Sequence, residues 1–242
     1  MTAIRSFIYL LGLFVFTPVY AILSLFSAPL SPKTRYAFIT LWNRIMLRWL
    51  SVTCGLRYEV YGRENLPKGP AVILSNHQSA WETIAFVEIF PPISYVLKRE
   101  LLRIPFFGWG LSLISPIAID RAGGKKSLKQ LLLQGNERIK EGFWVAVYPE
   151  GTRRKSGELG AFAIGGAWLA VQAGVPVIPV AHNAGFYWKR HAFMRRPGII
   201  KVYIGPAITT IGRKPDEVNN EARAWIEATL DEINVLNDMR SG

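Results

Sequence analysis

The chain has 242 residues, half of them hydrophobic, and carries a formal net charge of +12. This length suits one domain with a substantial core, and the charge points to nucleic acid, an anionic membrane or an acidic partner. Cys54 is the only cysteine, which excludes a disulfide framework and a Cys-x-x-Cys metal pair and fits a reducing compartment.

Residues 6–32 carry no charged side chain and exceed the roughly 20 residues that a helix needs to cross a bilayer. Pro18 lies in the middle, so two arrangements are open: a helix that spans the bilayer, or a kinked helix sunk into one leaflet. A secretory signal peptide is disfavoured. Its apolar core would be too long, and Pro29 directly after Ser27 and Ala28 makes a poor cleavage site.

The segment Pro32 to Thr53 has apolar residues at helical spacing, with arginines and lysine placed among tryptophans. This mixture is typical of a helix that lies at an anionic membrane surface. We therefore predict that residues 1–55 form a membrane-embedded helix pair that anchors the protein. The alternative is that both helices belong to the core of a globular fold.

From residue 56 to residue 242 the pattern predicts an α/β domain, because short apolar strands alternate with helices. Several strands are apolar on both faces, which predicts a mainly parallel or mixed sheet flanked by helices. Strands are expected at 56–61 (an edge strand), 71–74, 93–97, 116–119, 143–148, 175–180 and 199–204. Helices are expected at about 80–90, 127–140, 165–173 and 215–239, and residues 101–114 read as broken helix and apolar loop.

The stretch from Val72 to Thr83 combines a buried strand, a turn and the start of a helix. His77 lies in the turn, and Glu82 lies in the first helical turn, where its carboxylate can reach the imidazole. A carboxylate on one ring nitrogen fixes the tautomer of a histidine and prepares the other nitrogen to take a proton from a hydroxyl. The alternative is a helix-capping turn with an incidental histidine.

Two further strands end in cationic clusters, at Lys98-Arg99-Glu100 and at Glu150 to Lys155. In open α/β sheets ligands bind beyond the strand ends. Arginine offers a planar fork of donors that matches phosphate oxygens, and Gly151 lets the backbone approach closely. The sequence therefore predicts a base and an anion site at one edge of the sheet, although either cluster alone can be a solvated loop.

Four segments in this order resemble the motifs of the glycerolipid acyltransferases, and among them most closely the bacterial 1-acyl-glycerol-3-phosphate acyltransferases. The resemblance spans about residues 56–206. The first motif usually has an aspartate where this chain has Glu82. The four segments are Asn76 to Glu82, Lys98 to Leu101 with Pro105 and Gly108, Tyr148 to Arg153, and Val175 to Ala181.

The resemblance implies that His77, paired with Glu82, deprotonates a glycerol hydroxyl that attacks an acyl thioester directly. It implies that the substrate's phosphate is bound by Glu150, Gly151, Thr152 and Arg153, with Lys98 near the reacting centre. The expected acceptor is lysophosphatidic acid in a phospholipid bilayer, and the expected donor is acyl-CoA or acyl carrier protein. No cofactor or metal is expected, and His182 is interpreted as a polar residue at a strand end.

The same sequence features predict where the protein is located and leave alternatives for its function. The inner membrane is the expected location, with the catalytic domain on the cytoplasmic side. An acyltransferase for another lyso-lipid, such as a lyso-aminolipid, remains an alternative. A non-catalytic basic protein that binds membrane or nucleic acid is the alternative from a different class. We expect no nucleic-acid partner, because no known binding module is recognisable and the apolar amino-terminal segment argues against one.

Overall fold

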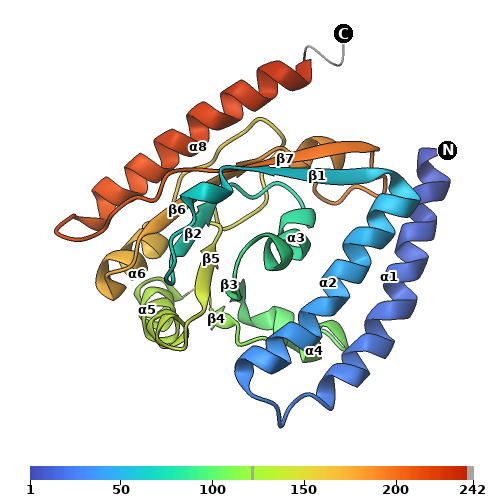
Figure 1. Cartoon of the computed structure of the whole chain (residues 1–242), viewed down its shortest axis with the longest axis horizontal. Coiled ribbons are helices and arrows are strands. Elements are labelled where there is room, and N and C mark those ends of the chain that lie inside the picture. The colour runs from blue at the N-terminus through green and yellow to red at the C-terminus, as the bar shows by residue number, and fades with distance from the viewer. Residues whose placement is uncertain (121–122, 239–242) are drawn as a thin grey trace.

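The structure is a computed structural model, and it describes residues 1–120 and 123–238. In this part of the chain seven strands form one sheet in the order β1-β7-β6-β2-β5-β3-β4 (Figure 1). Every neighbouring pair is parallel except β6 and β7, so the predicted mixed sheet is confirmed. The strands are β1 (Leu56–Tyr61), β2 (Val72–Ser75), β3 (Ile93–Lys98), β4 (Ile117–Ile119), β5 (Trp144–Val147), β6 (Val177–His182) and β7 (Gly198–Ile204).

The helices also follow the sequence pattern. They are α1 (Thr2–Leu25), α2 (Pro32–Cys54), α3 (Trp81–Ile89), α4 (Phe107–Leu113), α5 (Lys125–Lys140), α6 (Gly165–Ala173), α7 (Ala184–Tyr187) and α8 (Pro215–Asp238). The predicted end of the last helix, at Met239, lies outside the described residues. The four-residue α7 was not predicted, because it is too short to show a helical period in the sequence.

The two faces of the sheet have separate cores. Ile73 of β2 packs on the face covered by α1, α2 and α3, whereas its neighbours Val72 and Leu74 pack on the face covered by α5, α6 and α8. This division follows from the strand period of two, which sends successive side chains to opposite faces. A strand covered on both faces must be apolar throughout, and β2 is buried along its whole length.

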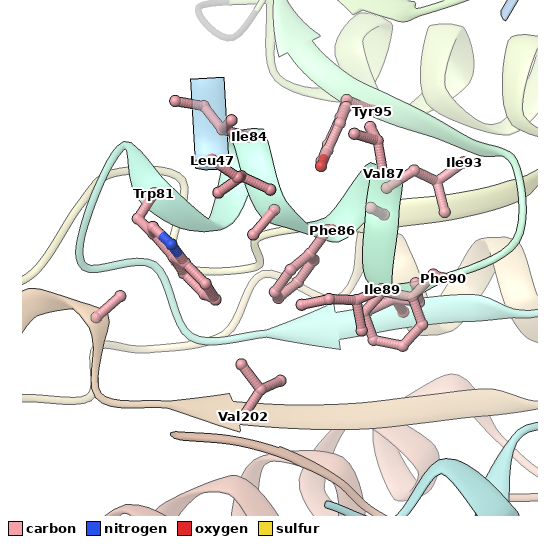
Figure 2. Packing of buried hydrophobic residues seen from close by; sticks show 14 of the residues in the cluster. Leu47, Trp81, Ile84, Phe86, Val87, Ile89, Phe90, Ile93, Tyr95 and Val202 are labelled. Carbon is pink, nitrogen blue, oxygen red and sulfur yellow. The ribbon is translucent and has the colours of Figure 1, made fainter. Parts of the chain in front are cut away.

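Helix α3 is the most deeply buried helix on the first face, and seven of its nine residues are buried. Figure 2 shows its apolar side chains held between Leu47 of α2 and Val202 of β7. Trp81 and Phe86 are among the largest fully buried side chains. At about 25 cal/mol per Å² of buried apolar area, such packing fixes the position of α3 and of the residues in its first turn.

Helices α1 and α2 share the core of the α/β part. Tyr9, Met46 and Leu50 belong to the same buried cluster as α3. The two helices cross closely at Gly12, where a Cβ would lie 2.2 Å from Nε1 of Trp49. The predicted boundary near residue 55 coincides with the end of α2, but the core continues across it, so the division into two domains stays a prediction.

Helix α1 is the one described helix that is long and apolar enough to cross a membrane. It leaves a row of large apolar side chains exposed, whereas α2 carries cations such as Arg44 and Arg48 on its exposed face. An exposed apolar patch of this size marks an interaction surface. The structure therefore provides one candidate membrane helix at the amino terminus, and α2 is its polar partner.

Arg195 joins α1 to the segment before β7. Its backbone N–H donates to Oγ of Ser6 at 2.9 Å, and its buried guanidinium lies 5.0 Å from the ring of Tyr9 and 4.5 Å from the ring of Trp188. A cation between two aromatic faces is attracted by both rings, most strongly where water is excluded. This contact ties the amino-terminal half of α1 to the α/β part.

We expect Arg195→Ala to lower the free energy of unfolding by about 2 kcal/mol, because a desolvated cation–π contact is lost. Arg196→Ala is the matched control, since Arg196 is the next residue and is exposed. Denaturant unfolding in detergent micelles measures both variants. Equal stability of the two would show that Arg195 does not hold α1 in place.

Candidate active site

The site forms where β2 and β5 end side by side. The two strands are parallel neighbours, and Leu74 of β2 pairs with Val147 of β5. Parallel strands end at the same edge of a sheet, so the residues that follow them meet there. Oε1 of Glu150 accepts the backbone N–H of His77 at 2.8 Å. This bond joins the two predicted motifs directly.

His77 and Glu82 are in contact, as the sequence predicts. Oε1 of Glu82 lies 2.8 Å from Nδ1 of His77 and also accepts the backbone N–H groups of Gln78 at 2.9 Å and Ser79 at 2.8 Å. Oγ of Ser79 accepts the N–H of Trp81 at 3.2 Å. This is the Ser-x-x-Glu pattern of a helix start, in which side chains satisfy the free donors of the first turn. The glutamate thus serves the helix end and the histidine together.

The carboxylate of Glu82 is fully buried. Burial alone would raise its pKa, but the hydrogen bonds from the ring of His77 and from the backbone N–H of Ser79 hold the pKa below its usual range. An ionised carboxylate only accepts hydrogen bonds, so Nδ1 of His77 carries the proton. The lone pair of the neutral ring is then on Nε2, which is the nitrogen available to a ligand.

A second buried histidine supports the end of β2. The side-chain amide of Asn76 donates to the carbonyl of His182 at 3.0 Å, and its oxygen accepts the N–H of His182 at 3.1 Å. Burial lowers the pKa of His182. Its Nδ1 accepts the N–H of Ala184 at 3.3 Å, so Nε2 donates to the carbonyl of Asn76 at 3.0 Å. His182 is therefore a neutral structural residue at a strand end, as interpreted from the sequence.

Tyr148 forms one wall of the site. Its ring stacks on the imidazole of His77 with centroids 4.3 Å apart and planes 15° apart. The side chain of His77 is 12% exposed, so most of the ring is covered. The stacking and the bond to Glu82 fix both the tilt and the rotation of the imidazole.

Glu150 is turned toward the protein. Its Oε2 accepts the N–H of Gly160 at 2.8 Å and lies 3.6 Å from Nε of Arg154. The backbone N–H of Arg154 in turn donates to the carbonyl of His77 at 2.7 Å. Burial raises the pKa of Glu150, and the N–H groups of His77 and Gly160 oppose that shift. The carboxylate predicted to bind substrate thus has its oxygens occupied by the protein.

The rest of the loop faces outward. Gly151 adopts a left-handed backbone with φ of 67°, which favours glycine, and Thr152 is exposed. Arg153 is partly exposed, and its Nε is buried without a hydrogen-bond partner in the described part of the chain. The carbonyl of Arg153 accepts from Nη1 of Arg190 at 3.0 Å. The loop after β5 therefore carries a partly exposed guanidinium.

Lys98 is at the end of β3, on the other side of β5 from β2. Its side chain is half exposed, and its ammonium lies 3.9 Å from the carboxylate of Glu100. In the residues described, Lys98 makes no hydrogen bond or ion pair with His77 or Glu82. The structure thus brings His77, Glu82 and Glu150 into one contact network and places Lys98 at the same sheet edge, outside that network.

Residues 1–120 and 123–238 contain no group of three or more His, Cys, Asp or Glu side chains that could hold a metal ion. Tyr148 was not predicted as a site residue, although the segment from Tyr148 to Arg153 begins with it, and Arg154 was predicted only as one cation of the cluster from Glu150 to Lys155. The available signal was an aromatic residue at the end of the strand next to β2. Its orientation toward His77 depends on tertiary packing and not on the local sequence.

Comparisons with known proteins identify the family of this chain. A family model described as Acyltransferase matches residues 57–183. A 1-acyl-sn-glycerol-3-phosphate acyltransferase of Pseudomonas aeruginosa is 49% identical over 97% of this chain and 93% of its own length. The 1-acyl-sn-glycerol-3-phosphate acyltransferase alpha of Mus musculus is 33% identical over 72% of this chain and 63% of its own length.

One solved structure has the same fold. The crystal structure of the 1-acyl-sn-glycerophosphate acyltransferase PlsC from Thermotoga maritima superposes with a TM-score of 0.79 over 96% of both chains, at 21% sequence identity. The match confirms the sheet and its helices, since identity at this level carries information on the fold alone. The family match and the extensive identity to the Pseudomonas protein go further: this chain belongs to the acyltransferase family.

Proposed function

We propose that the protein transfers a fatty acyl group from a thioester donor to the free hydroxyl of 1-acyl-glycerol-3-phosphate, which gives phosphatidic acid. The observation that carries the proposal is the pair of His77 and Glu82, 2.8 Å apart at a strand end beside a cationic loop. The Pseudomonas relative matches nearly the whole chain and is named for this acceptor, which supports the choice.

His77 acts as the general base in this mechanism. Nδ1 is held by Glu82, and Nε2 takes the proton from the acceptor's hydroxyl as its oxygen attacks the thioester carbonyl. A new C–O bond forms, the C–S bond breaks, and the departing thiolate receives the proton from the imidazolium. The ionised, buried carboxylate of Glu82 stabilises that imidazolium while it exists. The step requires no cofactor.

The transfer is direct, without an acyl-enzyme. A covalent route requires a nucleophile that is accessible beside the base. Ser75 and Ser79 are fully buried, and the hydroxyl of Ser79 is occupied by the N–H of Trp81. Cys54 is also buried, at the end of α2. None of these groups is presented to a thioester.

The cations at the sheet edge bind the charged parts of the substrates. Arg153 takes the phosphate of the acceptor, with Gly151 and Thr152 supplying the exposed turn around it. Lys98 binds the anionic substrate from the other side of β5. Glu150 positions His77 and the loop by its backbone contacts, and does not itself contact the phosphate.

The protein works at the inner membrane, with the α/β part on the cytoplasmic side. The acceptor is a membrane lipid, and the exposed apolar row of α1 supplies the contact with the bilayer. Acyl-CoA and acyl carrier protein are acidic donors, and the net charge of +12 favours the approach of either. Nucleic acid has no part in this reaction.

Thiol release tests the reaction and the base together. The full chain is incubated with acyl-CoA or acyl carrier protein and 1-acyl-glycerol-3-phosphate, and free thiol is followed with DTNB. A parallel panel of lyso-lipids, a lyso-aminolipid among them, identifies the acceptor. Preference for an acceptor without phosphate would overturn the proposed substrate.

We expect His77→Ala to lower kcat by roughly 10²–10⁴-fold, which is the usual contribution of a positioned base. Glu82→Gln should be damaging because it removes the charge, and Glu82→Asp should be milder because it keeps the charge. Circular dichroism checks that each variant is folded. Near-normal turnover of a folded His77→Ala variant would rule out the mechanism.

Glu150→Gln should lower both stability and turnover, because an amide cannot accept two backbone N–H groups on two oxygens. Loss of one charged hydrogen bond removes roughly 1.5–3 kcal/mol. Glu158→Gln is the control, since Glu158 is an exposed carboxylate in the same loop. Unfolding and kcat are measured on both variants, and unchanged values for Glu150→Gln would remove its positioning role.

Arg153→Ala should raise KM for 1-acyl-glycerol-3-phosphate about tenfold or more, since a charge-assisted hydrogen bond contributes roughly 1.5–3 kcal/mol. KM for the acyl donor should change less. Lys155→Ala, at an exposed position two residues on, is the matched control. An equal rise in KM for both substrates would mean that Arg153 supports the fold instead.

A further inference from the structure

The segment from Lys189 to Arg196, between α7 and β7, exposes two large apolar side chains. Phe193 is 48% exposed and Met194 is 54% exposed. Arg195, which follows Met194, is buried. The segment is therefore fixed at this residue, and the side chains on either side of it are exposed. Neither apolar side chain belongs to the site at the strand ends, and the reaction above gives them no role.

The segment lies against the amino-terminal end of α1. In Figure 1 the orange chain that leads into β7 reaches this end of the helix, and the bond from Arg195 to Ser6 agrees. Residues around Ser6 on α1 expose large apolar side chains, among them Ile4 and Phe7. Exposed apolar side chains therefore lie both on α1 and on the segment that is bonded to it.

The same segment is strongly basic. Lys189, Arg190 and Arg196 are exposed, and none of them forms an ion pair with a carboxylate in the part of the chain that the structure describes. The sequence has no aspartate or glutamate between Glu158 and Asp216. Exposed aromatic and apolar side chains surrounded by cations suit the interface of an anionic bilayer.

We propose that residues 189–196 are a second membrane-contacting element, which inserts Phe193 and Met194 among the headgroups of an anionic leaflet beside α1. An acidic protein would match the cations alone. The bond between this segment and α1, which has its own exposed apolar row, favours the lipid surface, because both then meet the same plane.

The contact has a consequence for the site, and this step rests on the proposed function. Nη1 of Arg190 donates to the carbonyl of Arg153 at 3.0 Å, so residues 189–196 are joined to the loop that carries Arg153. If residues 189–196 are held among the lipid headgroups, Arg153 is therefore kept close to the headgroups as well. The phosphate of an acceptor that still lies in the leaflet then meets the loop without leaving the membrane.

An environment-sensitive label tests the contact. Phe193→Cys is labelled with the fluorophore NBD, and Ala228→Cys, at an exposed position on α8, is the matched control. The parent chain is the blank, because its lone Cys54 is buried. On vesicles of phosphatidylglycerol and phosphatidylethanolamine, the label at position 193 should brighten and shift to shorter wavelength, and the label at 228 should not. Identical behaviour of the two labels overturns the proposal.

The charge is tested in the same background. Lys189→Gln, Arg190→Gln and Arg196→Gln together, or vesicles of phosphatidylcholine alone, should weaken the response at position 193, and so should high salt, because exposed charges are screened. A response that is independent of charge overturns the choice of an anionic surface. A response to acyl carrier protein without vesicles assigns the segment to a protein partner and overturns the membrane contact.

The result is separable from the reaction. Lipid contact needs no turnover, so the labelled protein is also measured with His77→Ala, where the same spectral change is expected. Absence of acyl transfer in the parent chain would refute the proposed function and leave this readout unaffected. Absence of the spectral change in an active enzyme would refute the membrane contact alone.

Discussion

A buried, ionised carboxylate is the constraint on which the site depends. A charge removed from water is stable only if hydrogen-bond donors surround it. Oε1 of Glu82 meets this requirement with His77 and two backbone N–H groups, all from the turn that precedes its own helix, whereas Oε2 is buried without a hydrogen-bond partner among the described residues. The turn must therefore close around the carboxylate. The orientation of the imidazole is a result of this closure, which the core packing of α3 holds in place.

Glu150 imposes the same requirement from the neighbouring strand. Its carboxylate accepts the N–H of His77, and the N–H of Arg154 donates to the carbonyl of the same residue. The backbone of His77 is thus bonded on both sides to one loop, and its side chain is bonded to Glu82. A histidine held in this way loses little freedom when substrate binds, which is the condition that the proposed role as a positioned base requires.

Local pattern predicted most of the elements and the contact between His77 and Glu82, because both depend on residues close in sequence. Strand order and the antiparallel pairing of β6 with β7 depend on contacts between distant segments, which period and composition do not encode. The inward direction of Glu150 has the same origin. Its partner Gly160 lies ten residues away, across a loop without regular structure, so the direction of the carboxylate could not be predicted, and its substrate-binding role rests on the family resemblance.

The amino-terminal helices α1 and α2 pack into the core of the α/β part. Because α1 and α2 share a core with α3, the exposed apolar row of α1 has a fixed position relative to His77. A flexible tether would hold the enzyme near the bilayer and leave its orientation free. A helix bonded to the core through Arg195 and packed at Gly12 also sets the direction in which the strand ends point. In the proposed reaction the acceptor lies in the leaflet, and orientation decides whether hydroxyl and base meet. On that proposal the buried contacts of α1 contribute to the mechanism as much as its exposed ones.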